Sequence, residues 1–416
     1  MLRDVLLLQK RELANRLRER YVERDVSESK LTNDLIKVII GPRRAGKSFF
    51  AMQQISRFGR FGYVNFDDER LAKIDDYDEL VTVLESLYEN PKHLLLDEVQ
   101  NLPDWELFAN RLQRQGYDLT ITGSNAHLLS SELATHLTGR HVQIVLFTFS
   151  FTEYLRAVGE ELTAIEMMEA LRRYSEDGGY PEPMLKNLDR RDYLSTLLRS
   201  TLYKDIVVRH RIRSPQGLED LATYLMSNIA QEYSLNRLRK LTHFKSVHTV
   251  DKYLRHLEEA LLFFSVRRFS YKLRNQVSTN RKIYCTDNGL VSSTSFRFSP
   301  DLGKFYENLV AVDLRKTQLE GGLEFYFWKS PQQEEVDFVI KRGLKITELI
   351  QVCVDTQDPK TRDREIRALL KASKALNCDN LLILTENVER DEDARWHDLR
   401  GKIRFVPLWK WFGRET

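Results

Sequence analysis

Short apolar runs recur along the first third of the chain, and charged, helix-favouring stretches separate them. The runs lie within residues 37–40, 61–68, 91–98, 118–125 and 142–149. A short unbroken apolar run is typical of a strand that is buried on both faces, as in a parallel sheet. The alternation of such runs with helical stretches therefore predicts an α/β domain built on a parallel sheet.

The pattern changes after residue 150. Residues 151–215 read as helices with one break at Asp177–Pro181, where Gly and Pro mark a turn. Between about Ser214 and Ser292 we expect three helices and a hairpin, at 218–229, 235–241, 247–260, 262–267 and 281–286. Beyond residue 300 helices and strands alternate at 304–316, 323–328, 336–340, 346–352, 361–376 and 381–384. We predict four parts, with boundaries at 1–150, 151–215, 216–298 and 299–416, and a helix over Met1–Arg16.

Composition narrows the class of protein only slightly. Of 416 residues, 42% are hydrophobic and 30% are charged, which is ordinary for a globular protein with a core. The net charge of +3 gives no general argument for nucleic acid, so any basic surface must be local. The three cysteines form no metal-ligand spacing, and no apolar run approaches a membrane span. We expect a cytoplasmic protein that does not enter a membrane.

The strand at 37–40 leads directly into Gly-Pro-Arg-Arg-Ala-Gly-Lys-Ser, and a helix-favouring run follows. Strand, glycine-rich loop and helix are the context of a phosphate-binding loop, and a chance turn is the alternative. The backbone amides and the helix N-terminus would hold the phosphates of ATP or ADP. The expected nucleotide contacts are Gly41, Pro42, Arg43, Arg44, Ala45, Gly46, Lys47, Ser48 and Phe49. Lys47 would reach the β- and γ-phosphates, and the Ser48 hydroxyl would bind Mg²⁺.

An apolar strand that ends in two acids, Asp97 and Glu98, follows about fifty residues later. At the end of a buried parallel strand, Asp97 would hold Mg²⁺ and Glu98 would polarise the attacking water. The next strand ends in small polar residues, and we expect Asn125, or Ser124, to orient the water and sense the phosphate. The alternative is that either residue caps the following helix.

Arg140 follows that helix and precedes the fifth strand. Its position suits an arginine finger that reaches a nucleotide on an adjacent subunit, which predicts a homo-oligomer. The alternative is an arginine that only interacts with the helix dipole, after a glycine cap.

These motifs, together with Asn-Phe-Asp-Asp at 65–68, Leu-Thr-Gly-Arg at 137–140 and Phe-Thr-Phe-Ser-Phe-Thr-Glu-Tyr at 147–154, resemble one group of archaeal and bacterial AAA+-like ATPases. The resemblance covers essentially the whole chain. It implies an AAA+ P-loop ATPase core, a helical lid, a winged helix-turn-helix and a C-terminal α/β domain similar to PD-(D/E)XK nucleases. It also implies that Pro181, in Gly179-Tyr180-Pro181, contacts the nucleotide, whereas a plain turn is the alternative.

The predicted winged helix carries basic residues on its third helix and wing. The DNA-binding candidates are Lys252, Arg255, Lys272, Arg274, Arg281 and Lys282, with His248 and His256 on polar positions of the third helix and Arg267 and Arg268 in the wing. A helix in the major groove and a basic wing on the backbone would give contacts mainly to phosphates. The alternative is that this part only packs against the lid or a partner protein.

The C-terminal part has a changed nuclease motif. Glu307 and Asp337 match the helical Glu and the second-strand Asp of the nuclease family, and Glu335 shares a strand face with Asp337. Gln351 and Cys353 stand where the family has Glu and Lys, and Glu348 would face the other way. We therefore expect a degenerate nuclease domain that contacts DNA or protein without cleaving.

Three functional hypotheses remain open from the sequence. The first is an ATP-driven, DNA-binding machine in which the lid relays the nucleotide state to the winged helix and C-terminal domain. The second is a signalling or defence switch whose nucleotide site stays closed until a protein partner binds. The third is an ATP-dependent nuclease.

Overall fold

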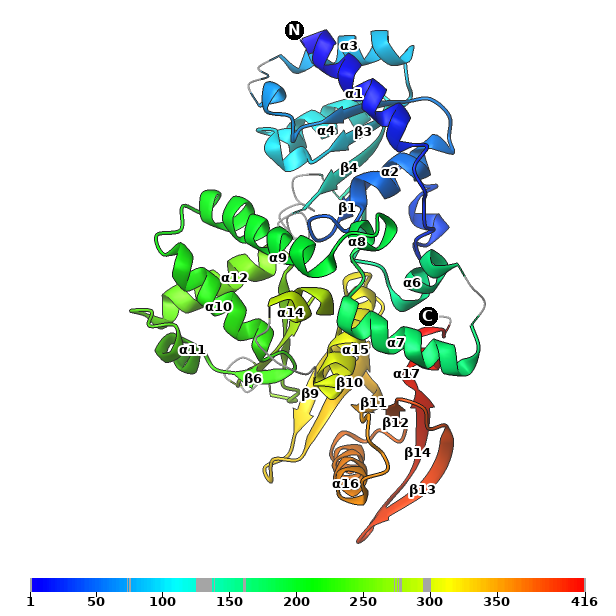
Figure 1. Cartoon of the computed structure of the whole chain (residues 1–416), viewed down its shortest axis with the longest axis vertical. Helices are drawn as coiled ribbons and strands as arrows, with labels where there is room; N and C mark the ends of the chain where they lie inside the picture. The colour runs from blue at the N-terminus through cyan, green and yellow to red at the C-terminus, as the bar shows by residue number, and fades with distance from the viewer. Residues whose placement is uncertain are drawn as a thin grey trace. The chain divides into compact units, whose positions relative to one another are not determined.

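The computed structural model describes residues 2–72, 74, 76–124, 137, 139–159, 162–272, 274, 276, 279–294 and 301–414. The chain divides into two compact units. The first contains residues 1–148 with 259–261, and the second contains residues 149–258 and 262–416. Figure 1 shows the helices and strands of both units.

The first unit is built on a parallel sheet of five strands in the order β2-β3-β4-β1-β5. The strands are β1 Ile36–Ile40, β2 Phe61–Asn65, β3 His93–Asp97, β4 Asp118–Gly123 and β5 His141–Val145. All five residues of β1 are buried, as expected for a central strand of a parallel sheet. Because β4 lies between β1 and β3, the carboxyl ends of these three strands meet at one edge.

Helices and short 3₁₀ turns surround this sheet. They are α1 Leu2–Arg16, α2 Lys47–Ser56, α3 Tyr77–Tyr88 and α4 Trp105–Arg114, with turns at Glu28–Lys30, Glu69–Leu71 and Val99–Asn101. The Asp76 carboxylate caps α3 by accepting hydrogen bonds from the Asp78 and Glu79 amides. The predicted N-terminal helix buries Val5, Leu6 and Leu13 in the core of this unit.

The second unit begins with helices. These are α6 Phe151–Val158, α7 Ala164–Asp177, α8 Pro181–Leu185, α9 Arg190–Ser200, a π-helical segment at Thr201–Val208 and α10 Pro215–Ser227. Ser150 with Glu153, and Thr163 with Glu166, form capping boxes that fix the starts of α6 and α7.

Next comes a three-stranded antiparallel sheet in the order β6-β8-β7, accompanied by two helices. The elements are β6 Gln231–Tyr233, α11 Leu235–Leu241, α12 Val247–Glu259, β7 Phe263–Arg267, β8 Arg281–Cys285 and, after the sheet, α14 Asn288–Thr294. The three expected helices, which are α10, α11 and α12, and both strands of the hairpin are present, and β6 and α14 were not expected.

The C-terminal part is a six-stranded mixed sheet in the order β13-β14-β12-β11-β10-β9. Its elements are α15 Leu302–Leu319, β9 Glu324–Lys329, β10 Glu335–Arg342, β11 Lys345–Val352, α16 Pro359–Leu376, β12 Leu381–Thr385, β13 Arg390–Trp396, β14 Leu399–Pro407 and α17 Leu408–Phe412. Alternate strand residues pack into two separate cores. Phe338 and Ile350 pack with α15, whereas Val339 and Leu349 pack with α16. The two helices therefore cover opposite faces of the sheet.

Most predicted elements are present within one to four residues of their expected ends, but β6, α14, β13, β14 and α17 were missed. Among the described residues, no helix combines the length and apolar character needed to cross a membrane.

Candidate functional site

The glycine-rich loop joins the end of β1 to the start of α2. Gly46 and Arg44 adopt left-handed backbone conformations, with φ of 92° and 64°. A Cβ on Gly41 would lie 1.9 Å from the Leu146 carbonyl oxygen, so only glycine fits there. Lys47 is 3% exposed, and its Nζ donates to the Pro42 carbonyl at 2.9 Å. The loop thus folds around its own lysine, next to the N-terminus of α2.

A buried arginine from the segment before β1 supports this loop. The Arg24 guanidinium donates to the Ala45 carbonyl at 3.0 Å and also to the Phe147 carbonyl. Ala45 belongs to the loop, and Phe147 follows β5. Arg24 therefore ties the loop backbone to the neighbouring strand end, a role that its sequence surroundings did not indicate.

Asp97 lies at the end of β3, 1% exposed, and collects hydroxyl groups from three elements. Its Oδ1 accepts from Ser48 at 2.7 Å and from Thr122, and its Oδ2 accepts from Tyr63 at 3.2 Å. Burial, and then the negative charge of Glu98, raise the pKa of Asp97, while the three hydroxyl bonds oppose the rise. Mg²⁺ prefers oxygen ligands, so the Ser48 hydroxyl and the Asp97 carboxylate together fit this ion.

Glu98 follows Asp97 in a left-handed backbone conformation, with φ of 53°. Non-glycine residues rarely adopt this conformation, and such positions concentrate at functional sites. The Glu98 amide donates to Thr122 Oγ1 at 3.1 Å, and its Oε2 accepts from Gln100 and from Ser124 at 3.3 Å. Thr122 consequently contacts both acids, and Ser124, one of the two sensor candidates, touches the carboxylate expected to act on water. Asn125, the other candidate, lies outside the described residues.

Arg140 lies at the amino ends of the strands, and the glycine-rich loop lies at their carboxyl ends. Its carbonyl accepts from the Ile36 amide at the start of β1, whereas the loop follows the other end of that strand. A strand of this length spans roughly 15 Å. The exposed Arg140 side chain is therefore too far to reach a nucleotide on its own subunit, and its proposed role requires a second copy of the chain.

The turn that contains Pro181 is held by a buried acid of the second unit. Asp287 accepts from the Gly179 amide at 2.8 Å, and a Cβ on Gly178 would lie 1.9 Å from Asp287 Oδ1. Pro181 itself opens α8, a position that suits its fixed φ. These contacts account for the turn, and the contact of Pro181 with a nucleotide stays a prediction.

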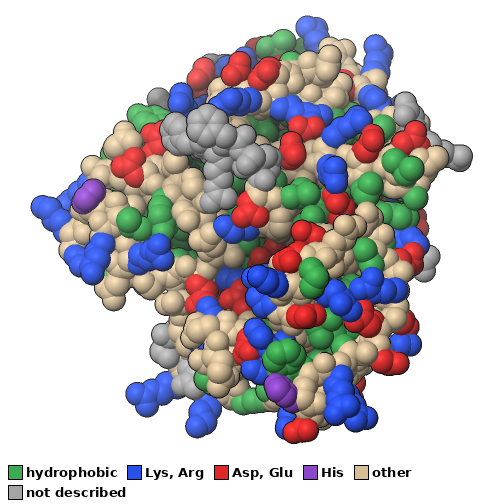
Figure 2. Space-filling model, turned by 60° about the horizontal axis from the view of Figure 1, so that its bottom comes forward, with side chains coloured by type: hydrophobic (Ala, Val, Ile, Leu, Met, Phe, Trp, Pro, Cys, Tyr) green, Lys and Arg blue, Asp and Glu red, His purple; other side chains and the backbone are tan. Residues whose placement is uncertain are grey.

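The DNA-binding candidates separate into exposed and buried groups. The side chains of Lys252, Arg255, Lys272 and Arg274 are exposed, and Arg281 is half-buried. Lys282 was wrongly placed among them, because it is 2% exposed and bound to carboxylates. Two other residues expected at polar positions of the third helix or in the wing also contact the protein itself. His256 is buried, and the Arg268 guanidinium donates to the Lys329 carbonyl. On the face shown in Figure 2, basic and acidic side chains are interspersed.

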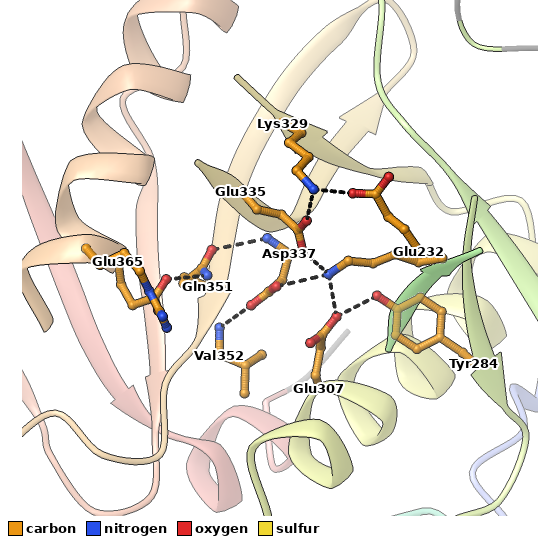
Figure 3. Close-up of polar contacts among 11 residues, drawn as sticks. Glu232, Tyr284, Glu307, Lys329, Glu335, Asp337, Gln351, Val352 and Glu365 are labelled. Atoms are coloured by element: carbon orange, nitrogen blue, oxygen red, sulfur yellow. Dashed lines mark hydrogen bonds and ion pairs between the residues drawn. The ribbon is translucent and has the colours of Figure 1, made fainter. Parts of the chain in front are cut away.

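The degenerate nuclease positions come together around Lys282, which comes from β8. Its Nζ lies 2.8 Å from Glu307 Oε1, 2.5 Å from Glu335 Oε1 and 3.3 Å from Asp337 Oδ1. Figure 3 shows these three carboxylates converging from α15 and β10. Glu335 and Asp337, expected on one face of the strand, both contact Lys282, whereas Glu348 contacts Asn380 and Arg404 elsewhere.

The third-strand positions do not offer metal ligands to this cluster. Gln351 accepts from the Asp337 amide at 3.1 Å and donates to Glu365 at 2.6 Å. Cys353 is buried, its thiol donates to the Asp355 carbonyl, and burial raises its pKa to about 12. With an ammonium group already among the carboxylates, the residues present do not fit the Mg²⁺ that the nucleases of the predicted resemblance would use.

Sequence reasoning missed the roles of four residues that shape these two sites, namely Arg24, Tyr63, Thr122 and Lys282, the last of which was assigned to DNA. Thr122 had a usable signal, since it is a hydroxyl residue at the end of a strand next to the one that carries the two acids. Tyr63 lies on β2, the other neighbour of β3, two residues before the end of that strand. Arg24 and Lys282 have no comparable local signal.

Comparisons with known proteins match the chain in three segments. A family model described as an AAA domain matches residues 33–155, and two described as domains of unknown function (DUF8612 and DUF4143) match residues 168–301 and 302–410. The uncharacterized protein MJ1544 of Methanocaldococcus jannaschii is 35% identical over 410 residues, covering 94% of this chain and 90% of that protein. An uncharacterized protein of Haemophilus influenzae is 27% identical, covering 86% and 88%.

Two solved structures show partial likeness. The Walker-type ATPase PABY2304 of Pyrococcus abyssi has a TM-score of 0.44 at 15% identity, covering 68% of this chain and 95% of that one. The replication initiator DnaA bound to AMPPCP and single-stranded DNA has a TM-score of 0.30 at 17% identity, covering 59% and 91%.

Proposed function

The chain belongs to the family of AAA+-like P-loop ATPases that it shares with its archaeal and bacterial relatives, and we propose that it is a Mg²⁺-dependent ATPase whose turnover is coupled to DNA binding. The observation that carries the proposal is a set of contacts at one edge of the sheet. Ser48 donates a hydrogen bond to Asp97, and Thr122 contacts both Asp97 and Glu98. This edge directly adjoins the glycine-rich loop.

Each residue at this edge has a separate role in ATP hydrolysis. Amides of the loop and the Lys47 ammonium bind the phosphates of ATP, and Ser48 and Asp97 hold the metal. Bound Mg²⁺ neutralises phosphate charge and orients the γ-phosphate. Glu98 orients and polarises the attacking water, and Ser124 and Thr122 hold its carboxylate and backbone in place. Arg140 completes the site of an adjacent copy.

The second unit supplies the DNA contact in this proposal. We interpret helices α10, α11 and α12 with the β6-β8-β7 sheet as a winged helix, and α12 presents the exposed Lys252 and Arg255. Exposed cations of this kind bind phosphates and give affinity without much sequence discrimination. Arg255 also pairs with Asp251 at 2.9 Å, so DNA phosphate would compete with that carboxylate.

A specific observation favours a second candidate, a nucleotide-dependent switch controlled by a protein partner. Two of the predicted wing cations, Arg268 and Lys282, are bound within the protein, which reduces the charge available for DNA. In this alternative the second unit regulates the nucleotide site until a partner binds.

Steady-state ATP hydrolysis separates the two candidates. The pure protein is assayed with no DNA and with single-stranded, duplex and branched DNA, at several protein concentrations. We expect one DNA form to stimulate turnover, and turnover per chain to rise with concentration if Arg140 acts between copies. Flat, slow turnover on every DNA would reject the coupled machine and favour the switch.

The Lys252→Ala/Arg255→Ala variant tests the DNA surface directly. We expect DNA affinity to fall about 3- to 10-fold and the slope of log affinity against log salt to drop by about 2, because two phosphate contacts are lost. Lys360→Ala/Lys374→Ala is the matched control, since it removes two exposed lysines from α16. An unchanged salt slope in the first variant, or an equal fall in the control, would remove α12 from the DNA site.

A further inference from the structure

We propose that Lys282 permanently fills the divalent-cation position of the nuclease-like site, so that the C-terminal domain is closed by an internal cation and does not bind Mg²⁺ there. The lysine comes from β8, outside the C-terminal sheet whose acids it binds. This inference is independent of the proposed ATPase function, because all of its residues lie in the second unit.

The geometry distinguishes an internal cation from a catalytic lysine. An ammonium group has three N–H donors, and here three carboxylate oxygens, from Glu307, Glu335 and Asp337, lie within 3.3 Å of it. A catalytic lysine must keep a donor for the scissile phosphate. Lys282 has all three donors satisfied and is 2% exposed, so it has no free donor to present.

The surrounding charges hold the lysine in its charged form. Burial alone lowers the pKa of Lys282, but the neighbouring acids, led by Glu307, raise it well above its usual value. Burial and the charge of Asp337 raise the pKa of Glu307, Lys282 opposes this rise, and the Tyr284 hydroxyl donates to Glu307 at 2.7 Å. A second ammonium, on Lys329, lies 3.6 Å from Glu335 and also binds Glu232. An entering divalent ion would therefore face a buried positive charge at close range.

The remaining groups of the site are also engaged with the protein. Asp337 Oδ2 accepts from the Val352 amide at 3.0 Å, and both ends of the Gln351 amide are hydrogen-bonded. Figure 3 shows this chain of contacts continuing to Glu365. Each of the three carboxylates therefore already has a protein partner.

The lysine also joins two parts of the second unit. The chain after β7 pairs with β9, where the Phe269 amide donates to the Phe327 carbonyl at 2.7 Å, and Lys282 attaches β8 to α15 and β10. The predicted winged-helix hairpin is thus attached to the C-terminal domain by backbone hydrogen bonds and by the Lys282 cluster.

The first test opens the site. Lys282→Met keeps most of the side-chain volume and removes the charge, and Asp97→Asn is included in every protein so that the nucleotide site does not respond to metal. We expect a lower melting temperature for Lys282→Met in EDTA, and a rise of about 4 °C or more on adding Mn²⁺ at 100 times its dissociation constant. Adding Asp337→Asn should abolish the rise, and the Lys282-containing parent should show none.

Two outcomes of that test overturn the proposal. One is a Mn²⁺-dependent rise in the Lys282-containing protein that Asp337→Asn removes. The other is a folded Lys282→Met protein that does not respond to Mn²⁺.

The second test uses the unmodified chain, so it does not depend on a variant that folds. Amine-reactive acetylation followed by mass spectrometry measures the exposure of each lysine, with the exposed Lys272 as the internal reference. We expect Lys282 to react at least 10-fold more slowly than Lys272, with and without Mn²⁺. Equal rates would mean that Lys282 is exposed, and a Mn²⁺-dependent increase at Lys282 would mean that metal displaces its ammonium group. Either result would overturn the proposal.

Discussion

The two acidic sites of this protein look alike in outline and differ in the partners of their carboxylates. At the end of β3, Asp97 accepts hydrogen bonds from the hydroxyls of Ser48, Thr122 and Tyr63. At the start of β10, Asp337 meets the buried ammonium of Lys282. Burial raises the pKa of both aspartates.

This difference explains why one site suits a metal and the other does not. Hydroxyl groups are neutral, so they satisfy a buried carboxylate without cancelling its charge, and a divalent cation is still attracted. A buried ammonium both satisfies and neutralises the carboxylates, and removing it would leave several acids uncompensated. A carboxylate cluster alone therefore does not identify a metal site, and the charge of its partners must be counted.

The largest expected effect is on Glu98. Glu98→Gln keeps the size of the side chain and removes the charge that polarises water, so kcat for ATP hydrolysis should fall about 10²- to 10³-fold while ATP still binds. Glu79→Gln, at an exposed position of α3, is the control and should retain normal turnover. Normal turnover in Glu98→Gln would exclude this residue from the chemistry.

The next effect concerns nucleotide affinity. Lys47→Ala removes the ammonium expected on the β- and γ-phosphates, and we predict a loss of affinity of about 100-fold, or about 2.7 kcal/mol, by calorimetry with ATP. Lys92→Ala removes an exposed lysine from the same unit and should bind ATP normally. Equal affinity in the two variants would refute the phosphate-loop assignment.

The closed site predicts a pH dependence of stability. Glu307 has a folded pKa of about 8, above the ordinary carboxyl value of 4.5, so the folded state holds its proton more tightly. The folded state then binds more protons than the unfolded state between those values, and the free energy of unfolding should fall as pH rises from 4.5 to 8. Urea unfolding of the second unit at several pH values measures this slope.

The Glu307→Gln variant tests the source of that slope, because it cannot titrate and keeps similar volume. We expect it to flatten the dependence, whereas Glu389→Gln, at an exposed position, should leave it intact. A slope unchanged by Glu307→Gln would show that Glu307 is not the group whose titration produces the pH dependence.

The smallest effect tests the hydroxyl partner that distinguishes the first site. Thr122→Val removes the hydroxyl group that donates to Asp97 and accepts a hydrogen bond from the Glu98 amide. We expect kcat to fall about 10-fold, because a buried hydrogen bond worth about 1.4 kcal/mol is lost. Thr122→Ser should restore most of the activity because it keeps the hydroxyl. Equal loss in both variants would point to packing in place of hydrogen bonding.

Local sequence patterns were sufficient to predict many residues of the first site. The loop from Gly41 to Ser48 and the acids Asp97 and Glu98 each belong to one continuous motif, and the buried strands that carry them are read from apolar runs. The role of Thr122 requires the strand order, because its hydroxyl reaches Asp97 only when β4 lies beside β3.

The second site was harder because its central residue is distant in sequence from its partners. Lys282 lies 25 residues from Glu307 and 55 from Asp337, and its neighbours Arg281 and Arg267 made it look like part of a basic wing. Only the packing of β8 against α15 turns it inward. The missed strands β13 and β14 have a related cause, since the charged residues of β13 suit an exposed edge and carry no strong apolar alternation.

The most direct test of the contrast between the two sites is the number of Mn²⁺ ions bound by the unaltered protein, measured by electron paramagnetic resonance with and without a non-hydrolysable ATP analogue. We predict one tightly bound ion per chain with the analogue and none without it. The ion should be lost in Asp97→Asn and unaffected by Asp337→Asn. A nucleotide-independent ion that disappears in Asp337→Asn would show that Lys282 does not close the second site, and would contradict the account.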